Sequence, residues 1–323
     1  METIPCNLCH HESARLVYEV EDTNYGQPGV FSIVECSHCG LVYLNPRPKA
    51  SEIGAFYLAD QYHPFRAIQQ THNIRPNKMQ RQRAAKIAAM FGHGTGGTVL
   101  DVGCGNGLFL LAMQAHGWQV QGVEPNETAV AFANERLNLP VTVGDIFQIS
   151  LLESFDLITF WDVLEHTHSP KDVLLQANLL LKPDGVLAIN VPNWASWERK
   201  LFKEQWIALD APRHLYHFSP ETLTTMLNGC GFDLAELRCA APVMNPASNL
   251  LRFLGNARRR ARPTGNGPLP GRAAPGGSES PSAVKRWLIR ATYLALTWPN
   301  FMANVMRRGG SFTVFARKRK AEV

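Results

Sequence analysis

The chain has 323 residues, of which 45% are apolar, so it is long enough to bury a sizeable core and is not a disordered protein. Its formal net charge is +5, but residues 240–323 hold fifteen Lys/Arg against two Asp/Glu, whereas residues 1–239 are acidic overall. No start typical of a signal peptide and no apolar stretch of transmembrane length occurs, so the sequence predicts a cytoplasmic protein with no membrane-spanning helix.

Residues 1–48 contain two Cys-x-x-Cys pairs, Cys6/Cys9 and Cys36/Cys39, separated by twenty-six residues. Each short pair can present two thiolates to one tetrahedral metal ion. An odd count of seven cysteines without a secretion signal favours this interpretation over disulfides or a redox pair. The spacing predicts a zinc ribbon with a closed four-cysteine site for Zn²⁺, which leaves no open coordination position and is therefore structural.

Residues 51–91 are expected to be helical. Met79, Ile87, Met90 and Phe91 fall near helical spacing, and a glycine-rich stretch follows them. This helical segment belongs to a predicted unit of residues 49–97.

From residue 98 onward, apolar strand-like segments alternate with helical segments. This alternation predicts an α/β fold with a doubly wound, seven-stranded, mostly parallel sheet. Helices are expected over 108–116 and 127–137, from Ser169-Pro170, and after Ser219-Pro220. The expected strands are 98–102, 118–123, 141–143, 155–161, 186–191, 232–239 and 311–316.

A glycine loop follows the first of these strands. It reads Asp101-Val102-Gly103-Cys104-Gly105-Asn106-Gly107, and Glu124 comes twenty-one residues after Gly103. Glycines let the backbone approach a ligand closely, and an acid at that distance can accept hydrogen bonds from a ribose diol. The dinucleotide-binding pattern would need a glycine at position 108, where Leu108 stands. The alternative is that these glycines form a tight turn between a strand and a helix and bind no ligand.

Five motifs follow one another from this loop onward: Asp101–Gly107, Gly122–Pro125, Gly144–Ile146, Phe155–His166 and Leu181–Gly185. In these motifs and their order the sequence closely resembles the class I S-adenosylmethionine-dependent methyltransferases. The resemblance implies that the cofactor's methionine part lies against the glycine loop, that Glu124 binds the ribose, and that Asp145 binds the adenine amino group. It also implies that Ile146 packs on the adenine ring and that the loop from Asp162 flanks the sulfonium. The implied cofactor-binding residues are Asp101, Gly103, Gly105, Glu124, Asp145, Ile146 and Asp162.

The resemblance also implies a division of the chain. Residues 98–241 and 310–318 would form the S-adenosylmethionine-binding core, with the last strand antiparallel. Residues 49–97 would cover the cofactor site. Residues 242–309 would be an insertion between the last two strands of this core.

Methyl transfer to oxygen, nitrogen or an enolisable carbon can need a base, for which histidine fits best. His214 is the first candidate and His166 the second. His214 lies in the segment 206–218. The sequence of this segment resembles methyltransferases that act on small molecules and on glycan- or lipid-linked substrates. His166 could instead only cap the following helix, and His217 could be a core histidine. The tryptophans of 193–218 could form a substrate lid, although packing over the sheet edge is the default.

The cysteine module resembles the zinc ribbons of certain deoxysugar C-methyltransferases and of some ribosomal RNA guanine methyltransferases. The RNA-type family would need a basic ribbon, but residues 1–48 carry more Asp and Glu than Arg and Lys. We therefore expect a small-molecule, glycan-linked or lipid-linked acceptor. An RNA methyltransferase is the alternative, and a non-catalytic binding protein on this fold is another. Nucleic acid is the less favoured partner.

Residues 242–309 combine an arginine cluster, a Pro/Gly-rich stretch and the apolar segment 287–302. Apolar and aromatic residues flanked by cations are typical of a helix lying in an anionic membrane interface. This pattern predicts a peripheral contact at the inner face of the membrane. A helical pair packed on the body, with its arginines in solvent, is the alternative.

Overall fold

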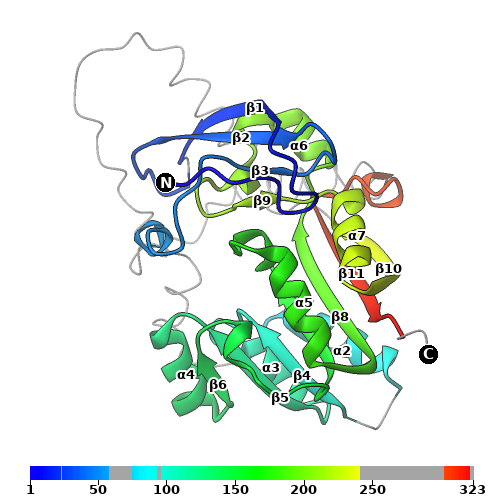
Figure 1. Cartoon of the computed structure of the whole chain (residues 1–323). Helices are drawn as coiled ribbons and strands as arrows, with labels where there is room; N and C mark the ends of the chain where they lie inside the picture. The colour runs from blue at the N-terminus through cyan, green and yellow to red at the C-terminus, as the bar shows by residue number, and fades with distance from the viewer. Residues whose placement is uncertain (23, 58–74, 93–95, 241–301, 321–323) are drawn as a thin grey trace, which may run out of the picture.

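Two β-sheets dominate the computed structural model, which describes residues 1–22, 24–57, 75–92, 96–240 and 302–320 (Figure 1). The smaller sheet contains β1 (Ala14–Glu21), β2 (Val30–Cys36), β3 (Val42–Leu44) and β9 (Tyr216–His217). The larger sheet contains β4 (Thr98–Val102), β5 (Gln119–Glu124), β6 (Val141–Val143), β7 (Phe155–Trp161), β8 (Leu181–Pro192), β10 (Phe232–Ala240) and β11 (Ser311–Lys318).

The larger sheet has the strand order β10-β11-β8-β7-β4-β5-β6. Strands β4 to β8 pair in parallel, whereas β11 pairs antiparallel with both β8 and β10. This confirms the predicted doubly wound, seven-stranded, mostly parallel sheet. Because β4 has β5 on one side and β7 on the other, the winding reverses there, and the loops after these strands meet at one ligand-binding edge.

Helices cover both faces of the larger sheet. Val99 of β4 packs in a core with α2, α3 and α4, whereas Leu100 and Val102 pack in a second core with α5 and α7. The alternation follows from the strand geometry, since successive side chains point to opposite faces. The helices are α2 (Lys78–Met90), α3 (Leu108–Gln114), α4 (Glu127–Leu137), α5 (Pro170–Leu180), α6 (Trp197–Phe202) and α7 (Pro220–Gly229). Short 3-10 turns are η1 (Ile53–Phe56), η2 (Ile146–Gln148), η3 (Leu164–His166), η4 (Lys203–Gln205) and η5 (Ile207–Leu209).

The predicted helical segment 51–91 is helical only in part. Within the described residues it contains η1 and α2, and residues 58–74 lie outside them. Of the residues at helical spacing, Ile87 is buried in the core, whereas Met79 and Met90 are half exposed. A capping box at Asn77 begins α2, which then packs along α3.

The smaller sheet is completed by a segment from far along the chain. Strand β9 comes from the insertion between β8 and α7, and Tyr216 pairs there with Tyr43 of β3. Trp194 and Trp206 of the same insertion are buried, with their rings 6.4 Å apart, and Trp194 also packs on Tyr18 of β1. These two tryptophans therefore pack in the core, and the cysteine-bearing sheet shares that core with the body.

Most of the insertion predicted for residues 242–309 lies outside the described residues, and so does the apolar segment 287–302 except for Met302. Strand β11, which follows it, is described and lies between β8 and β10. Among the described residues, none of the helices has the length and apolar character needed to cross a membrane.

Candidate functional site

The glycine loop joins β4 to α3 at the carboxyl edge of the larger sheet. A Cβ added at Gly103 would come within 2.6 Å of Val163, so only glycine allows the loop to pack against the segment after β7. A Cβ added at Gly105 would meet no atom of the described residues within 4 Å, because this residue faces open space. Both residues have positive φ, of +68° and +55°, which favours glycine. The loop thus presents exposed backbone where a ligand can approach.

Glu124 ends β5 beside this loop. Its carboxylate accepts hydrogen bonds from the backbone N–H groups of Gly105 and Asn126, each at 2.9 Å. Burial raises the pKa of Glu124, and the two N–H donors act against that rise. These bonds hold the carboxylate at the edge of the glycine loop, and its other lone pairs can accept from a ligand diol.

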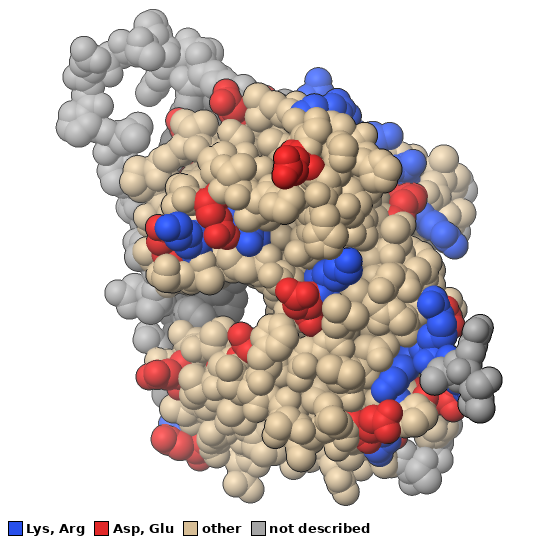
Figure 2. Space-filling model, in the orientation of Figure 1, with Lys and Arg blue, Asp and Glu red and all other residues tan. Residues whose placement is uncertain are grey.

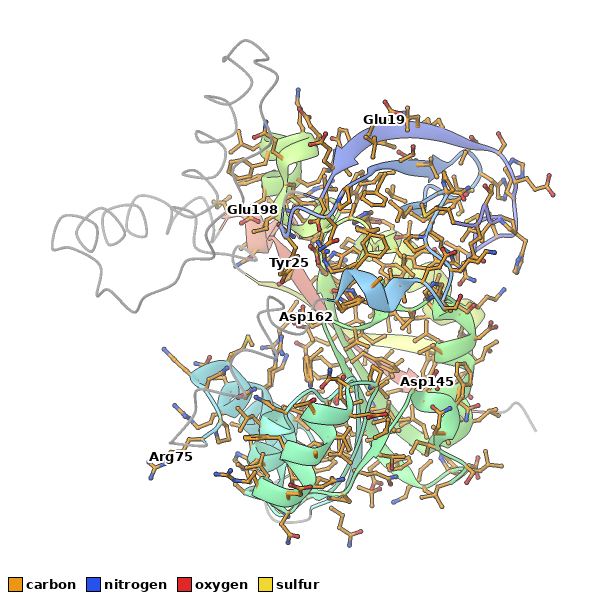
Figure 3. The ribbon with its side chains drawn as sticks, turned by 90° about the vertical axis from the view of Figure 1, so that its left-hand side faces the viewer. Glu19, Tyr25, Arg75, Asp145, Asp162 and Glu198 are labelled. Carbon is orange, nitrogen blue, oxygen red and sulfur yellow. The ribbon has the colours of Figure 1, made fainter. Side chains whose placement is uncertain are left out.

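Asp101 and Asp162 lie at the ends of neighbouring strands but in different surroundings. Asp101 is buried and accepts a hydrogen bond from Thr159, and burial raises its pKa to about 7. Asp162 has a half-exposed side chain that accepts from Asn190 at 2.6 Å and lies 3.6 Å from Arg83 of α2. Figure 3 places Asp162 at the junction between the two sheets. Asp162 therefore lies at the carboxyl edge of the larger sheet with its side chain half exposed, whereas the Asp101 side chain lies in the protein interior.

The turn after β6 carries the two residues implied for the adenine. Asp145 is exposed and caps η2 by accepting from the Phe147 backbone N–H at 2.9 Å. Ile146 is fully buried in the protein core, whereas Phe147 is half exposed. The contact implied for Asp145 stays a prediction, but Ile146 has no open surface with which to pack on a ring.

A pair of histidines lies between the two sheets. His166 belongs to η3, after β7, and His214 precedes β9, with their ring centroids 4.5 Å apart. The Leu215 backbone N–H donates to the Glu165 carbonyl at 2.8 Å and so joins the two loops. His166 does not cap α5, because its Nδ1 lies 2.9 Å from both the Arg213 carbonyl and the Tyr57 hydroxyl. The structure thus brings together the two histidines that the sequence singled out.

Burial controls the protonation of these rings. It lowers the pKa of His166 to about 3, and it also lowers the pKa of His214, where Asp210 acts in the opposite direction. Both imidazoles are therefore neutral near pH 7. His217 is a buried core histidine whose Nε2 has no hydrogen-bond partner among the described residues.

Arg213 fixes the loop that carries His214. Its guanidinium is fully buried and binds Asp22 of the N-terminal segment at 2.7 Å and Asp210 at 2.8 Å. Tyr25 lies beneath it, 4.3 Å from guanidinium carbon to ring centroid. An ion pair thereby joins the smaller sheet to the loop that carries His214.

Sequence reasoning missed Asp22 and Tyr57, since no local pattern indicates contacts across so many residues.

The four cysteines of the N-terminal segment converge, as the spacing predicts. All four sulfur atoms lie within 4.8 Å of one another. Cys6 Sγ lies 3.4 Å from Cys39 Sγ, and Cys9 Sγ lies 3.6 Å from Cys36 Sγ. A disulfide needs about 2.0 Å, whereas thiolates about 2.3 Å from a tetrahedral Zn²⁺ lie about 3.8 Å apart. The thiols are free and their spacing fits a tetrahedral ion.

A hollow in the surface separates the part of the molecule built on the smaller sheet from the part that carries α3 and α4 (Figure 2). The parallel strands run toward this junction (Figure 1). The glycine loop, Glu124, Asp162 and the histidine pair belong to segments that follow the carboxyl ends of β4, β5, β7 and β8. The arrangement can hold a ligand at the sheet edge with titratable groups beside it.

Three known proteins show the extent of similarity to this chain. The 1,6-didemethyltoxoflavin-N1-methyltransferase of Burkholderia thailandensis aligns over 90% of this chain and 96% of its own, with 16% identity and a TM-score of 0.48. The ubiquinone biosynthesis O-methyltransferase of Actinobacillus pleuropneumoniae serotype 5b is 33% identical over 158 residues, which cover 45% of this chain and 67% of that protein. The protein of the same name from Rhodopseudomonas palustris BisB5 is 25% identical over 229 residues, which cover 65% of this chain and 90% of that protein.

The family model for a methyltransferase domain matches residues 76–237, which is half of the chain. The match includes β4 to β8, the glycine loop, Glu124 and both histidines. The motifs, the sheet order and this match agree, and the chain belongs to the class I S-adenosylmethionine-dependent methyltransferases.

Proposed function

We propose that this chain methylates a hydroxyl group of a small molecule, which is either free or linked to a lipid or a glycan. The observation that carries the proposal is the histidine pair beside the Asp162 loop, at the edge where the glycine loop and Glu124 lie. The relatives named ubiquinone biosynthesis O-methyltransferases support an oxygen acceptor on a lipid-type molecule.

The residues present fit S-adenosylmethionine. Gly105 faces open space, which allows a ligand to lie against the backbone, and the Glu124 carboxylate is held beside it. When bound, the cofactor supplies a methyl group on a sulfonium. Gly103, Gly105 and Glu124 would hold it, Asp145 would reach the adenine, and Asp162 would border the sulfonium.

The chain's own groups then orient the acceptor and remove its proton. His214 Nδ1 lies 2.8 Å from the Ala208 carbonyl, so Nδ1 carries the proton and Nε2 keeps a lone pair. That Nε2 can accept the proton of an acceptor hydroxyl. Burial lowers the pKa of His166 to about 3, which makes it a poor base near pH 7 and supports His214 as the first candidate. A cation held by the pair would be a second way to activate the hydroxyl.

We also propose that the four-cysteine cluster holds one structural Zn²⁺. The near-tetrahedral sulfur spacing supports it, and four thiolates leave no position open for substrate. The proposed role is to fix β1 to β3 and, through Asp22, the Arg213 loop.

A radiolabelled methyl-transfer assay tests the proposed reaction. The acceptor panel should contain catechols, polyprenylated phenols, deoxysugar nucleotides and total RNA. We expect label on a phenolic or sugar hydroxyl and none on RNA. Label confined to RNA would contradict the acceptor class.

The peripheral membrane contact remains a proposal that rests on the sequence of residues 242–309, most of which are not described. Co-sedimentation with anionic vesicles tests it. Binding should weaken with salt and should disappear when residues 250–306 are replaced by a short linker. Protein that stays in the supernatant at low salt would contradict it.

A further inference from the structure

Glu165 joins the histidine pair to form a three-residue cluster. One ligand atom from each of Glu165, His166 and His214 lies within 4.8 Å of the other two. We infer that this cluster binds a divalent transition-metal cation, separate from the cysteine site. The inference deepens the proposed function and rests on it, because it names how an acceptor hydroxyl is activated at the same place.

The hydrogen bonds of the two rings prepare them as ligands. His166 Nδ1 lies 2.9 Å from the Arg213 carbonyl, and His214 Nδ1 lies 2.8 Å from the Ala208 carbonyl. A carbonyl only accepts, so each Nδ1 carries the proton and each Nε2 presents a lone pair. Histidines that bind metals commonly donate their second ring nitrogen to a backbone carbonyl in this way.

The Glu165 carboxylate needs a positive partner. Only 1% of the residue is exposed, and neither carboxylate oxygen has a hydrogen-bond partner among the described residues. A buried unpaired carboxylate is costly unless a cation or a proton compensates it. A neutral imidazole keeps one lone pair, so all three members of the cluster can accept but the carboxylate finds no donor among them. A cation at its centre would satisfy all three groups at once.

The surrounding charges also favour a cation. Asp210 binds the buried guanidinium of Arg213 at 2.8 Å and also lies beside the cluster. Asp210 Oδ2 lies 3.9 Å from His214 Nε2.

The ligand set indicates the kind of cation. Two imidazoles and one carboxylate suit Zn²⁺, Fe²⁺ or Mn²⁺ and leave coordination positions open. An acceptor hydroxyl that occupied an open position would release its proton to water at a lower pH. His166 has an intermediate exposed fraction, whereas Glu165 and His214 are buried.

Zinc content of the full-length protein tests the inference. Purified protein is dialysed against Zn²⁺ and then against metal-free buffer, and the bound zinc is counted. Wild type should keep one more zinc ion per chain than Glu165→Gln, which preserves the side-chain size. Exposed Glu19→Gln is the matched control and should keep the wild-type content. Zinc-edge X-ray absorption of wild type should show nitrogen and oxygen neighbours besides sulfur.

The inference would be overturned if wild type held no more zinc than Glu165→Gln and if its zinc had sulfur neighbours only. His214→Gln serves as a second variant, and binding of S-adenosylhomocysteine checks that each variant is folded. The absorption spectrum of wild type decides the matter even if both variants fail to fold. Failure of the proposed function is a separate result, because it would appear as absent methyl transfer whatever the zinc content.

Discussion

Arg213 Nη2 lies 2.7 Å from Asp22 Oδ1, and both side chains are fully buried. This ion pair joins the end of β1 to the loop whose carbonyl at Arg213 contacts the ring of His166. The cysteine-bearing segment is thus connected to the proposed catalytic pair by two direct contacts, Asp22 to Arg213 and Arg213 to His166.

Asp22→Asn should lower the free energy of unfolding by about 3 kcal/mol, because it leaves a buried guanidinium with one carboxylate partner in place of two. Urea denaturation measures this loss. The neighbouring exposed Glu21→Gln is the control and should change stability by less than about 0.5 kcal/mol. Equal stability of the two variants would show that the pair does not hold the junction.

His214→Ala should lower the methyl-transfer rate by roughly 10²–10⁴ without changing the affinity for S-adenosylmethionine. The ring lies at the acceptor side of the site and not on the glycine loop, so binding of the cofactor should not sense it. Steady-state rates and calorimetry measure the two effects. His116→Ala, an exposed histidine, should leave both unchanged. Normal turnover in His214→Ala would exclude it as the base and as a needed ligand.

Because His217 is buried, the free energy of unfolding should decrease as the pH falls. Burial lowers its pKa to about 3, against about 6.5 in the unfolded chain. Between these values only the unfolded chain binds the proton, so the stability is fully present above pH 6.5 and is lost as the pH falls. The advantage of wild type over His217→Gln should shrink by about 2 kcal/mol from pH 7.5 to pH 5.

Urea unfolding of both proteins at the two pH values measures the difference. His116→Gln is the control, because its exposed ring should leave the gap to wild type unchanged. A gap for His217→Gln that is the same at both values would mean that burial does not perturb this ring.

Cys36→Ser should remove one zinc ion per chain and lower the melting temperature, because three thiolates hold the ion less tightly. Metal analysis and thermal melting with and without chelator measure both effects. Cys239→Ser, outside the cluster, should keep the wild-type zinc content. A Cys36→Ser protein with wild-type zinc would contradict a zinc site built from all four cysteines.

The larger sheet could be predicted because each of its signals is local. The Asp101–Gly107 loop, the acid at Glu124 and the alternating segments lie within short windows, and the structure reproduces the helix over Glu127–Leu137 and the strand over Phe155–Trp161 at the predicted bounds. The four cysteines were equally predictable, because their chemistry requires convergence whatever lies between them.

The junction between the sheets could not be predicted for the opposite reason. Asp22 and Arg213 are 191 residues apart, and β9 is too short to show strand periodicity. Met79 and Met90 fit a helical spacing but face solvent, because α2 buries only Ala84 and Ile87. Periodicity identified the helix, and tertiary packing decided which of its residues are buried.

Calorimetric titration of S-adenosylhomocysteine into the pure protein tests the central claim most directly. The account predicts binding at one site per chain. It also predicts that Glu124→Ala weakens binding by roughly 1–3 kcal/mol through lost hydrogen bonds. Exposed Glu127→Ala should bind as wild type does. Wild type that binds neither S-adenosylhomocysteine nor S-adenosylmethionine would contradict the account.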